Sequence, residues 1–452
     1  MKEKKLDAIS PIDGRYRDKV DSISKYFSEK ALIYYRLKVE IEYFLFLCKN
    51  RIGKLKPLNS IEKNNLRNIY NDFSIKDALK IKKIEEKTNH DVKAVEYFIK
   101  NKFDDYKLSR YKEFIHFGLT SQDINNTAIP LSIKEFISNI YLPELDKLIK
   151  HLDQLSKKYK DISIISRTHG QPASPTKLGK EILVFSTRIK NQRKNLIRIP
   201  NSAKFAGAVG NFNAHKVAFP ETNWKDFGKR FVELELGLDY SFPTTQIEHY
   251  DSFASLCDNV RRINNILLDL SLDIWTYISL DYFKQKINKD EVGSSAMPHK
   301  INPIDFENAE GNIGIANSIF DFFSNKLTKS RLQRDLSDST VLRNIGVPFS
   351  HTVISIKSII KGLDKLIVNK TKINADLEDN WIIISEAIQT ILRREGYSNP
   401  YESLKELTRK NSSITKENLH KFIDSLDVSE KIKNELKVIT PSNYTGIYNY
   451  EF

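Results

Sequence analysis

Cysteine is scarce in this chain. Only Cys48 and Cys257 occur among 452 residues, and they lie far apart in the sequence. This usage excludes a disulfide framework and a cysteine-based metal cluster. The nine histidines show no HExxH-like spacing on one helix face, so we expect no metal site. Both cysteines are expected to be reduced core residues.

Long apolar runs are also missing. The beginning, MKEKKLDAISPIDGRY, carries positive charge but no apolar segment behind it. No later stretch offers the roughly 18 uncharged apolar residues that a membrane span needs. With 40% hydrophobic and 29% charged residues, the chain has enough apolar surface to offset the conformational entropy lost on folding. We expect a globular, cytoplasmic protein with no membrane contact.

Acidic residues are too few to balance the basic ones. Lys and Arg number 72 against 58 Asp and Glu, which gives a formal charge of +14. Such an excess is compatible with nucleic acid, an anionic lipid surface or small polyanionic substrates. The lysines are scattered, as in IKDALKIKKIEEK, which is typical of compositional bias and not of a binding stripe. We expect no nucleic-acid partner.

Strand-like alternation is scarce, and helical periodicity dominates. Apolar residues on several segments recur at spacings of three and four, which predicts a mainly α fold built around a bundle of long helices. Apolar residues such as Leu268, Leu272 and Trp275 extend beyond one face, so we also expect oligomerisation. The three seams are Ile263, Leu267, Leu270, Ile274, Tyr277; Leu145, Leu148, Ile149, Leu152, Leu155; and Val353, Ile356, Ile359, Ile360, Leu363, Leu366, Ile367.

Breaks in the helical pattern divide the chain. They fall at Pro143, at residues 167–175 and at residues 293–303, where Gly, Ser and Pro stop a helix. The predicted domains are an N-terminal helical domain (1–112), a central long-helix bundle (113–365) and a small helical C-terminal domain (366–452). Asp427, three residues before Glu430, is a candidate capping box for the last helix.

The strongest chemical pattern is GSSAMPHKINP at residues 293–303. Its glycine lets the backbone approach a ligand, its serines offer hydroxyls, and Lys300 and Asn302 can hold carboxylate oxygens. Clusters of Ser, Gly and Pro are commonly surface turns. This string, however, resembles the signature GSSxMPxKxNP of the fumarase/aspartase superfamily at every fixed position, which implies a three-part fold whose tetramer forms a large helical core.

Within that superfamily, SSAMPHK and the following IDFENAEGN are similar to the adenylosuccinate lyase family. Two further segments resemble the same family: SRTHGQPASPTKLGKE (166–181), with His169 as candidate acid, and HFGLTSQDINNTA (116–128). In the latter, Thr120 and Ser121 precede a helix whose N-terminal amides favour anions. A simple helix N-cap is the alternative reading of that pair.

The resemblance implies the roles of the other candidate site residues. Arginine suits phosphate because its planar fork donates two hydrogen bonds at once. By this resemblance, the nucleotide phosphate and ribose would be bound by Arg15, Tyr16, Arg334, Ser339 and Arg343. The succinyl carboxylates would be bound by Thr120, Ser121, Lys300 and Asn302. Further binding residues are His90, Asp91, Gln246, Ser295 and Asn308.

The chemistry implied by this family is the β-elimination of fumarate from adenylosuccinate and from succinyl-aminoimidazole carboxamide ribotide. Ser294 would act as general base and His169 as general acid, with no cofactor, in a homotetramer with active sites at subunit interfaces.

The glycine-rich AGAVGN at 206–211 lacks the P-loop Lys-Ser/Thr and the full GxGxxG fingerprint, so we assign it no cofactor. Argininosuccinate lyase, a retired lyase scaffold that only binds, and a basic nucleic-acid-binding protein are the alternatives.

Overall fold

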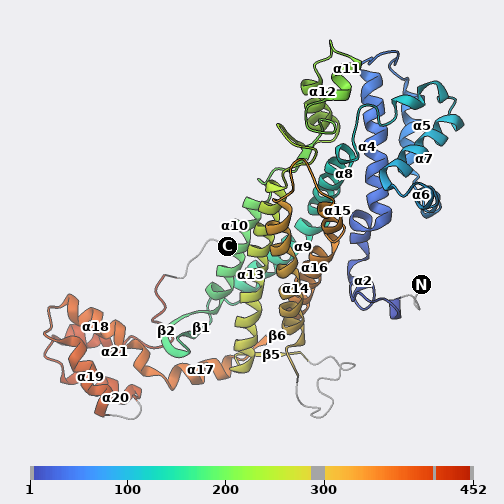
Figure 1. Ribbon diagram of the computed structural model, residues 1–452. Helices are drawn as coiled ribbons and strands as arrows, with labels where there is room; N and C mark the ends of the chain where they lie inside the picture. The colour runs from blue at the N-terminus through green and yellow to red at the C-terminus, as the bar shows by residue number, and fades with distance from the viewer. Residues whose placement is uncertain (1–4, 287–300, 411–413, 448–452) are drawn as a thin grey trace. The chain divides into compact units, whose positions relative to one another are not determined.

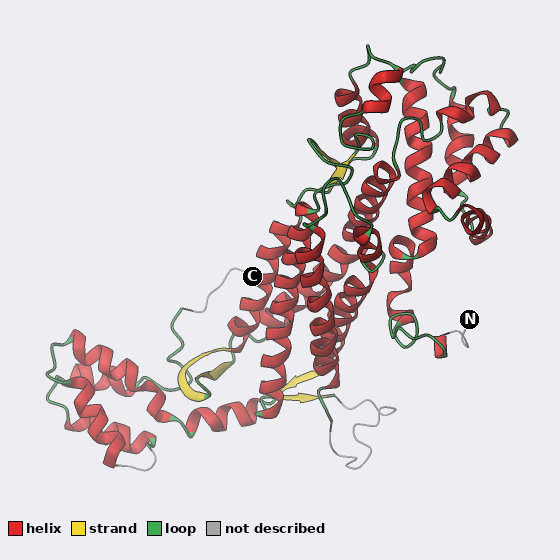
Figure 2. Cartoon of the chain, in the orientation of Figure 1, coloured by secondary structure: helices red, strands yellow, loops and turns green. Residues whose placement is uncertain are grey.

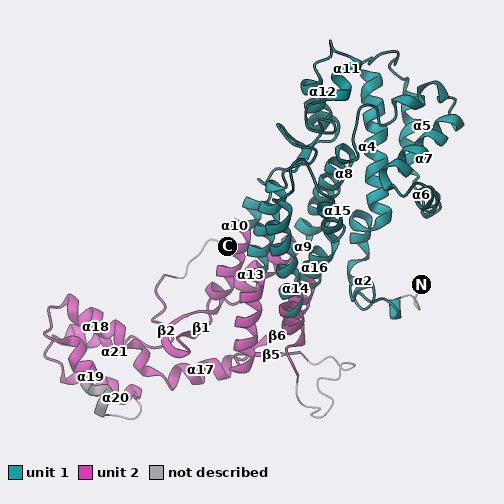
Figure 3. Cartoon of the chain, viewed as in Figure 1, with its two compact units in different colours: residues 1–145, 192–265, 311–356 teal, residues 146–191, 266–310, 357–452 magenta. Residues whose placement is uncertain are grey.

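The computed structural model describes residues 5–286, 301–410 and 414–447. Helices dominate these residues, and the strands are short, as Figure 2 shows. This confirms the predicted mainly α class. The chain separates into two compact units, drawn in Figure 3: residues 1–145, 192–265 and 311–356 form unit 1, and residues 146–191, 266–310 and 357–452 form unit 2. The predicted domain boundaries near residues 112 and 365 stay predictions.

The helices are numbered as in Figure 1. Those up to residue 230 are α2 (Arg17–Val20), α3 (Ser24–Phe27), α4 (Glu29–Lys49), α5 (Ser60–Asn71), α6 (Ile75–Thr88), α7 (Asp91–Asp105), α8 (Ser121–Phe136), α9 (Leu142–Lys158), α10 (Leu178–Leu196), α11 (Asn213–Ala218) and α12 (Trp224–Arg230). The later helices are α13 (Asp251–Ser279), α14 (Ile304–Leu327), α15 (Ser337–Leu342), α16 (Gly346–Asp364), α17 (Lys370–Glu378), α18 (Ser385–Arg394), α19 (Pro400–Lys410), α20 (Lys416–Ser425) and α21 (Glu430–Lys437).

Short 3-10 and π segments join several of these helices: η1 (Asp21–Ile23), η2 (Ser109–Phe114), η3 (Ile137–Tyr141), η4 (Phe231–Glu235) and η5 (Trp381–Ile384). The strands of the described residues form two-stranded sheets. The pairs are β1 (Ser163–Thr168) with β2 (Gln171–Lys177), antiparallel; β3 (Ser202–Lys204) with β4 (Asp239–Ser241), parallel; and β5 (Phe283–Gln285) with β6 (Leu366–Val368), antiparallel.

Helix α4 is the centre of the unit 1 core. Buried residues occur all around it, so one partner surface could not cover it. It packs against α5, α7 and α8, which surround it in Figure 1. Aromatic rings fill the space at its C-terminal half, where Tyr43 and Phe46 contact Phe227 and Phe231. The contacts of α4 with α7 and α8 position these two helices, whose N-terminal ends carry candidate site residues.

The predicted helical seams are largely confirmed. Ile263, Leu267, Leu270 and Ile274 are buried on α13, and the seam around Leu145 lies on α9. The third seam was predicted too long, because α16 ends at Asp364 and residues 366 and 367 belong to β6. Pro143 lies in the first turn of α9, directly after the π-helical segment η3, and the helical run from α8 continues past it.

The predicted break at 167–175 is confirmed: it is the β1–β2 hairpin, which brings Thr168 opposite Gln171 and precedes α10. One local prediction was wrong. The capping box assigned to Asp427 is not formed, because Ser429 caps α21 by accepting a hydrogen bond from the Ile432 N–H. A serine next to the first helical residue reaches that amide, whereas Asp427 lies two residues too early.

A buried charge cluster ties α8 to the chain after β3. The Asp123 carboxylate and the Lys204 ammonium are both fully buried, with Asp123 Oδ1 2.7 Å from Lys204 Nζ. The same oxygen accepts hydrogen bonds from the Ala206 and Gly207 N–H groups at 2.9 and 3.0 Å. The other oxygen, Oδ2, accepts one from the Thr120 N–H at 2.9 Å. We call Asp123, Lys204, Ala206 and Gly207 the Asp123 cluster.

Burial lowers the pKa of Lys204, and the adjacent Asp123 carboxylate opposes that shift. A buried pair of this kind is costly to break, since one uncompensated charge then remains in the interior. The Asp123 cluster therefore makes the first turn of α8 depend on the chain at residues 204–207.

We predict that Asp123→Asn destabilises the protein by about 3–5 kcal/mol, because it leaves the Lys204 ammonium buried without its partner. The matched control is Glu113→Gln. It removes a carboxylate that is 87% exposed and pairs with Lys100 at 3.4 Å, so its cost should stay below about 1 kcal/mol. Urea unfolding followed by circular dichroism measures both. Equal midpoints for the two variants would contradict the importance of the buried pair.

Candidate active site

The N-terminus of α8 presents one group of predicted site residues. Thr120 is the N-cap and Ser121 the first residue of α8, so the capping alternative for Thr120 is realised in this structure. The preceding loop needs Gly118, whose φ is +70° and whose added Cβ would meet the His215 ring at 2.8 Å. The positive end of the helix dipole at this first turn favours anions.

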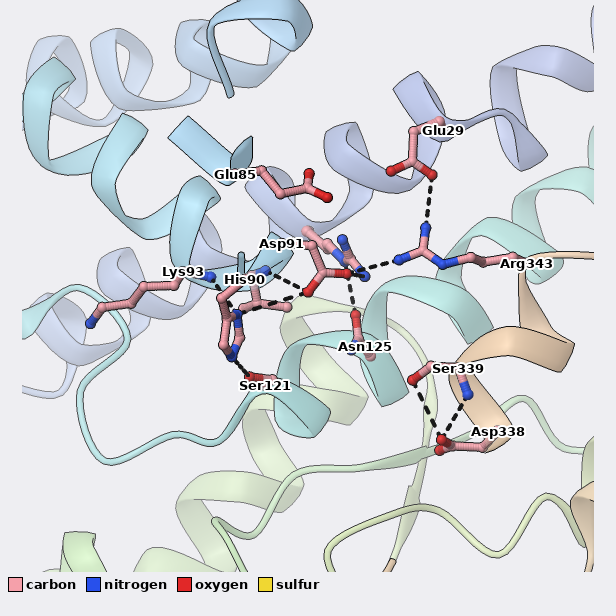
Figure 4. Close-up of polar contacts among 12 residues, drawn as sticks. Glu29, Glu85, His90, Asp91, Lys93, Ser121, Asn125, Asp338, Ser339 and Arg343 are labelled. Atoms are coloured by element: carbon pink, nitrogen blue, oxygen red, sulfur yellow. Dashed lines mark hydrogen bonds and ion pairs between the residues drawn. The ribbon is translucent and has the colours of Figure 1, made fainter. Parts of the chain in front are cut away.

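The N-terminus of α7 lies beside it in Figure 4. His90 caps α7, and its Nδ1 accepts a hydrogen bond from the Lys93 N–H at 3.2 Å. In the neutral ring the proton therefore sits on Nε2, which faces Ser121 Oγ at 3.5 Å. His90 and Ser121, two predicted site residues 31 positions apart in the sequence, are thus in contact.

Asp91 links three elements. Its Oδ2 accepts hydrogen bonds from Arg36 Nη2 at 2.7 Å and from Arg343 Nη2 at 3.0 Å. Its Oδ1 accepts from the Val92 N–H at 2.8 Å. Burial opposes ionisation of this carboxyl, but the Arg36 charge and the hydrogen bonds outweigh it and lower the pKa of Asp91. Arg36 Nε donates to Asn125 Oδ1 on α8 at 2.8 Å.

Arg343 is more exposed than Arg36 and Asp91, and it pairs with a second carboxylate. Its Nη1 donates to Glu29 Oε2 at 2.8 Å, as Figure 4 shows. We call Glu29, Arg36, Asp91, Asn125 and Arg343 the Arg343 cluster. It joins α4, α7, α8 and the end of α15 within unit 1.

Arg334 and Ser339 form a neighbouring group before and within α15. Arg334 Nη2 donates to Ser339 Oγ at 2.8 Å and lies 3.4 Å from Asp338 Oδ1. With its amide oxygen facing the guanidinium, Gln122 of α8 accepts from the same nitrogen at 2.6 Å. A small pocket of about 70 Å³ is lined by Gln122, Ser339 and members of the Arg343 cluster. Guanidinium, hydroxyl and amide groups in this arrangement suit a phosphate.

Three predicted residues of unit 1 remain: Gln246, Arg15 and Tyr16. Gln246 Nε2 donates to the Ala208 carbonyl at 3.0 Å. Arg15 and Tyr16 lie in the turn before α2, where Arg15 is exposed. Among the residues that the structure describes, Arg15 makes no hydrogen bond to the Arg343 cluster. Their roles therefore rest on the resemblance.

Unit 2 holds three further predicted residues. His169 is exposed at the tip of the β1–β2 hairpin, where its φ of +53° and that of Gly170, +75°, match a two-residue type I′ turn. Asn302 precedes α14, and Asn308 on α14 accepts a hydrogen bond from Ser358 Oγ at 3.2 Å. Ser294, Ser295 and Lys300 lie outside the described residues.

The structure adds residues that the sequence analysis missed, above all Arg36, Glu29, Gln122 and Asn125. One signal was available: Arg36 is the charged residue of the apolar segment ALIYYRL (31–37) in α4, and a buried charge needs a partner. Among the residues that the structure describes, no group of acidic, histidine or cysteine side chains could hold a metal ion, and no helix has both the length and the apolar character to cross a membrane.

Solved structures share this fold. A fumarate lyase from Mesorhizobium sp. BNC1 matches with a TM-score of 0.74 over 94% of this chain and 95% of its own, at 17% identity. A 3-carboxy-cis,cis-muconate lactonizing enzyme from Pseudomonas putida matches with a TM-score of 0.71 over 94% of both chains, at 15% identity. At such identities the likeness concerns the fold alone.

Sequence comparison is more specific. A family model described as "Lyase" matches residues 14–318, and one described as "Adenylosuccinate lyase C-terminal" matches residues 330–445. The adenylosuccinate lyase of Dictyostelium discoideum is 57% identical, covering 98% of this chain and 97% of its own. That of Escherichia coli K12 is 45% identical, covering 99% and 98%. The chain therefore belongs to the adenylosuccinate lyase family.

Proposed function

We propose that this protein eliminates fumarate from adenylosuccinate, giving AMP, and from succinyl-aminoimidazole carboxamide ribotide, giving the free carboxamide. The observation that carries this proposal is the identity of 45–57% to adenylosuccinate lyases over nearly the whole chain. The grouping of arginine, serine and helix N-terminal amides in unit 1 supports it, because both substrates carry a phosphate and two carboxylates.

In this proposal the phosphate is bound by Arg334, Ser339 and Arg343, with Arg15 and Tyr16 completing the nucleotide site. Arg334 and Ser339 already face one another at 2.8 Å. Binding energy from the phosphate would position the succinyl arm, which lies far from the phosphate in the substrate. The arginines thereby contribute to turnover without touching the reacting carbon.

The succinyl carboxylates are assigned to Thr120 and Ser121 at the N-terminus of α8, together with Ser295, Lys300 and Asn302. Positive potential at a helix N-terminus favours such anions. His90, Asp91, Gln246 and Asn308 are assigned supporting contacts. The contact between His90 and Ser121 at 3.5 Å supports a shared role for α7 and α8.

The elimination requires a base and an acid. Ser294 would remove the proton beside the carboxylate, the carbon–nitrogen bond would break as the fumarate double bond forms, and His169 would protonate the departing nitrogen. A serine hydroxyl is a weak base, so its alkoxide needs a dry, positively charged surrounding, for which Lys300 is the candidate. The exposed hairpin tip leaves His169 accessible for this task.

We predict that the purified protein converts adenylosuccinate to stoichiometric AMP and fumarate, and that Ser294→Ala and His169→Ala each lower kcat by at least about 10²-fold. An ultraviolet assay with separate quantification of AMP and fumarate measures this. Circular dichroism should show wild-type folding for His169→Ala, since the side chain is exposed.

Argininosuccinate serves as the control substrate and should be inert. No turnover of adenylosuccinate by a correctly assembled protein would reject the proposed function and favour a retired scaffold. Substantial residual activity in one variant would reject only the role assigned to that residue.

We further propose a homotetramer in the cytoplasm, with active sites that draw residues from several subunits. Exposed large apolar residues on α13 and α14 support assembly: Leu272, Trp275, Ile315 and Phe322 are each 43–51% exposed. Cys48 and Cys257 are both buried and free, which fits a reducing compartment.

We predict that Leu272→Glu together with Phe322→Glu dissociates the assembly and lowers activity at least about tenfold, because each charge would be placed in an apolar interface. Analytical ultracentrifugation and the ultraviolet assay, run on the same samples, measure the two effects. Exchange of the already exposed Val217 for Glu, at 82% exposure, provides the control. A fully active monomer would contradict shared sites.

A further inference from the structure

Glu29 forms an ion pair with Arg343, the arginine to which the proposed function assigns phosphate binding. It is the first residue of α4, and its Oε2 accepts a hydrogen bond from Arg343 Nη1 at 2.8 Å. The second terminal nitrogen of Arg343 donates to Asp91 at 3.0 Å. Both terminal nitrogens, the pair that would grip a phosphate, are therefore engaged by carboxylates in the free protein (Figure 4).

The two carboxylates differ in how firmly they are held. Asp91 is 26% exposed and also accepts hydrogen bonds from the buried Arg36 and from the Val92 N–H. Its pKa is lowered, because the Arg36 charge and these hydrogen bonds outweigh the opposing effect of burial. Asp91 therefore stays ionised and in place when Arg343 changes partner.

Glu29 is the exchangeable carboxylate. Its side chain is 43% exposed, and that of Arg343 is 41% exposed, so their ion pair is screened by water and weak. A second cation is within reach, because Lys82 Nζ lies 3.5 Å from Glu29 Oε1. Glu29 can thus give up Arg343 without losing all of its charge pairing.

The pocket under this ion pair offers further donors. Glu29, Arg36, Gln122, Asn125, Ser339 and Arg343 all line it. Arg36 is only 4% exposed, and its Nη1 is buried with no hydrogen-bond partner among the residues that the structure describes. An unsatisfied buried guanidinium N–H is costly, and an anion that enters the pocket would relieve it.

Resting on the proposed function, we propose that Glu29 is a competing carboxylate that holds Arg343 in the free protein and is displaced by the phosphate of the nucleotide. Its competition sets the affinity of the site for phosphate. Ligands without a phosphate offer Arg343 no replacement for Glu29, so they gain nothing from its displacement. Glu29 thereby contributes to discrimination between nucleotides and nucleosides.

We predict that Glu29→Gln strengthens the binding of AMP by about 2- to 5-fold, the range expected for loss of a partly exposed ion pair. Isothermal titration calorimetry at fixed ionic strength measures the affinity. Adenosine, which lacks the phosphate, should bind Glu29→Gln and the wild type equally. In steady-state assays the KM for adenylosuccinate should fall without a rise in kcat.

Glu85→Gln is the matched control. Glu85 pairs with the same lysine, Lys82, at 2.8 Å but makes no contact with Arg343. Both substitutions change the net charge by the same amount. An equal gain in AMP affinity for Glu29→Gln and Glu85→Gln would mean that net charge alone explains the effect, and it would overturn the proposal. In an Arg343→Gln background, Glu29→Gln should have no further effect on AMP affinity.

Weaker AMP binding by Glu29→Gln would also overturn the proposal, because Glu29 would then support the site and not compete for it. Failure of the proposed function is recognised separately, by the absence of adenylosuccinate turnover in the wild type. Unchanged AMP affinity in Glu29→Gln with normal wild-type turnover would reject the role of Glu29 alone.

Discussion

The carboxylate of Asp123 makes the geometry of unit 1 possible. It is fully buried, and it binds the Lys204 ammonium and the N–H groups of Thr120, Ala206 and Gly207. A charge in the interior is tolerated only when paired and hydrogen-bonded in this way. One carboxylate oxygen accepts from Thr120 and the other binds residues 204–207. The start of α8 is therefore fixed to a segment about eighty residues later in the chain.

A series of polar contacts connects α8 to Arg343. Asn125 binds the buried Arg36, Arg36 binds Asp91, and Asp91 binds Arg343. From Arg36 onward each partner is more exposed, with side-chain exposures of 4% for Arg36, 26% for Asp91 and 41% for Arg343. Firmly held side chains thus support a more exposed one. This order suits the phosphate site that we propose, with a rigid base and an exposed arginine at its mouth.

The sequence predicts the elements better than it predicts the contacts between them. Apolar spacing identified α9 and α13, and the string around Ser294 identified the family. The β1–β2 hairpin was missed because a His-Gly turn with both φ values positive is an uncommon hairpin signal. Arg36 and Glu29 were missed because their partners lie far away in the chain. The glycine-rich run at 206–211, which superficially suggests a phosphate loop, instead binds the internal carboxylate of Asp123.

We propose that the nucleotide phosphate binds at Arg343, next to Ser339 and Arg334. A crystal structure of the protein with AMP bound tests this most directly. We expect the phosphate within hydrogen-bond distance of the Arg343 guanidinium and the Ser339 hydroxyl, with Glu29 turned away from Arg343. A phosphate bound elsewhere, with Glu29 still paired to Arg343, would contradict it.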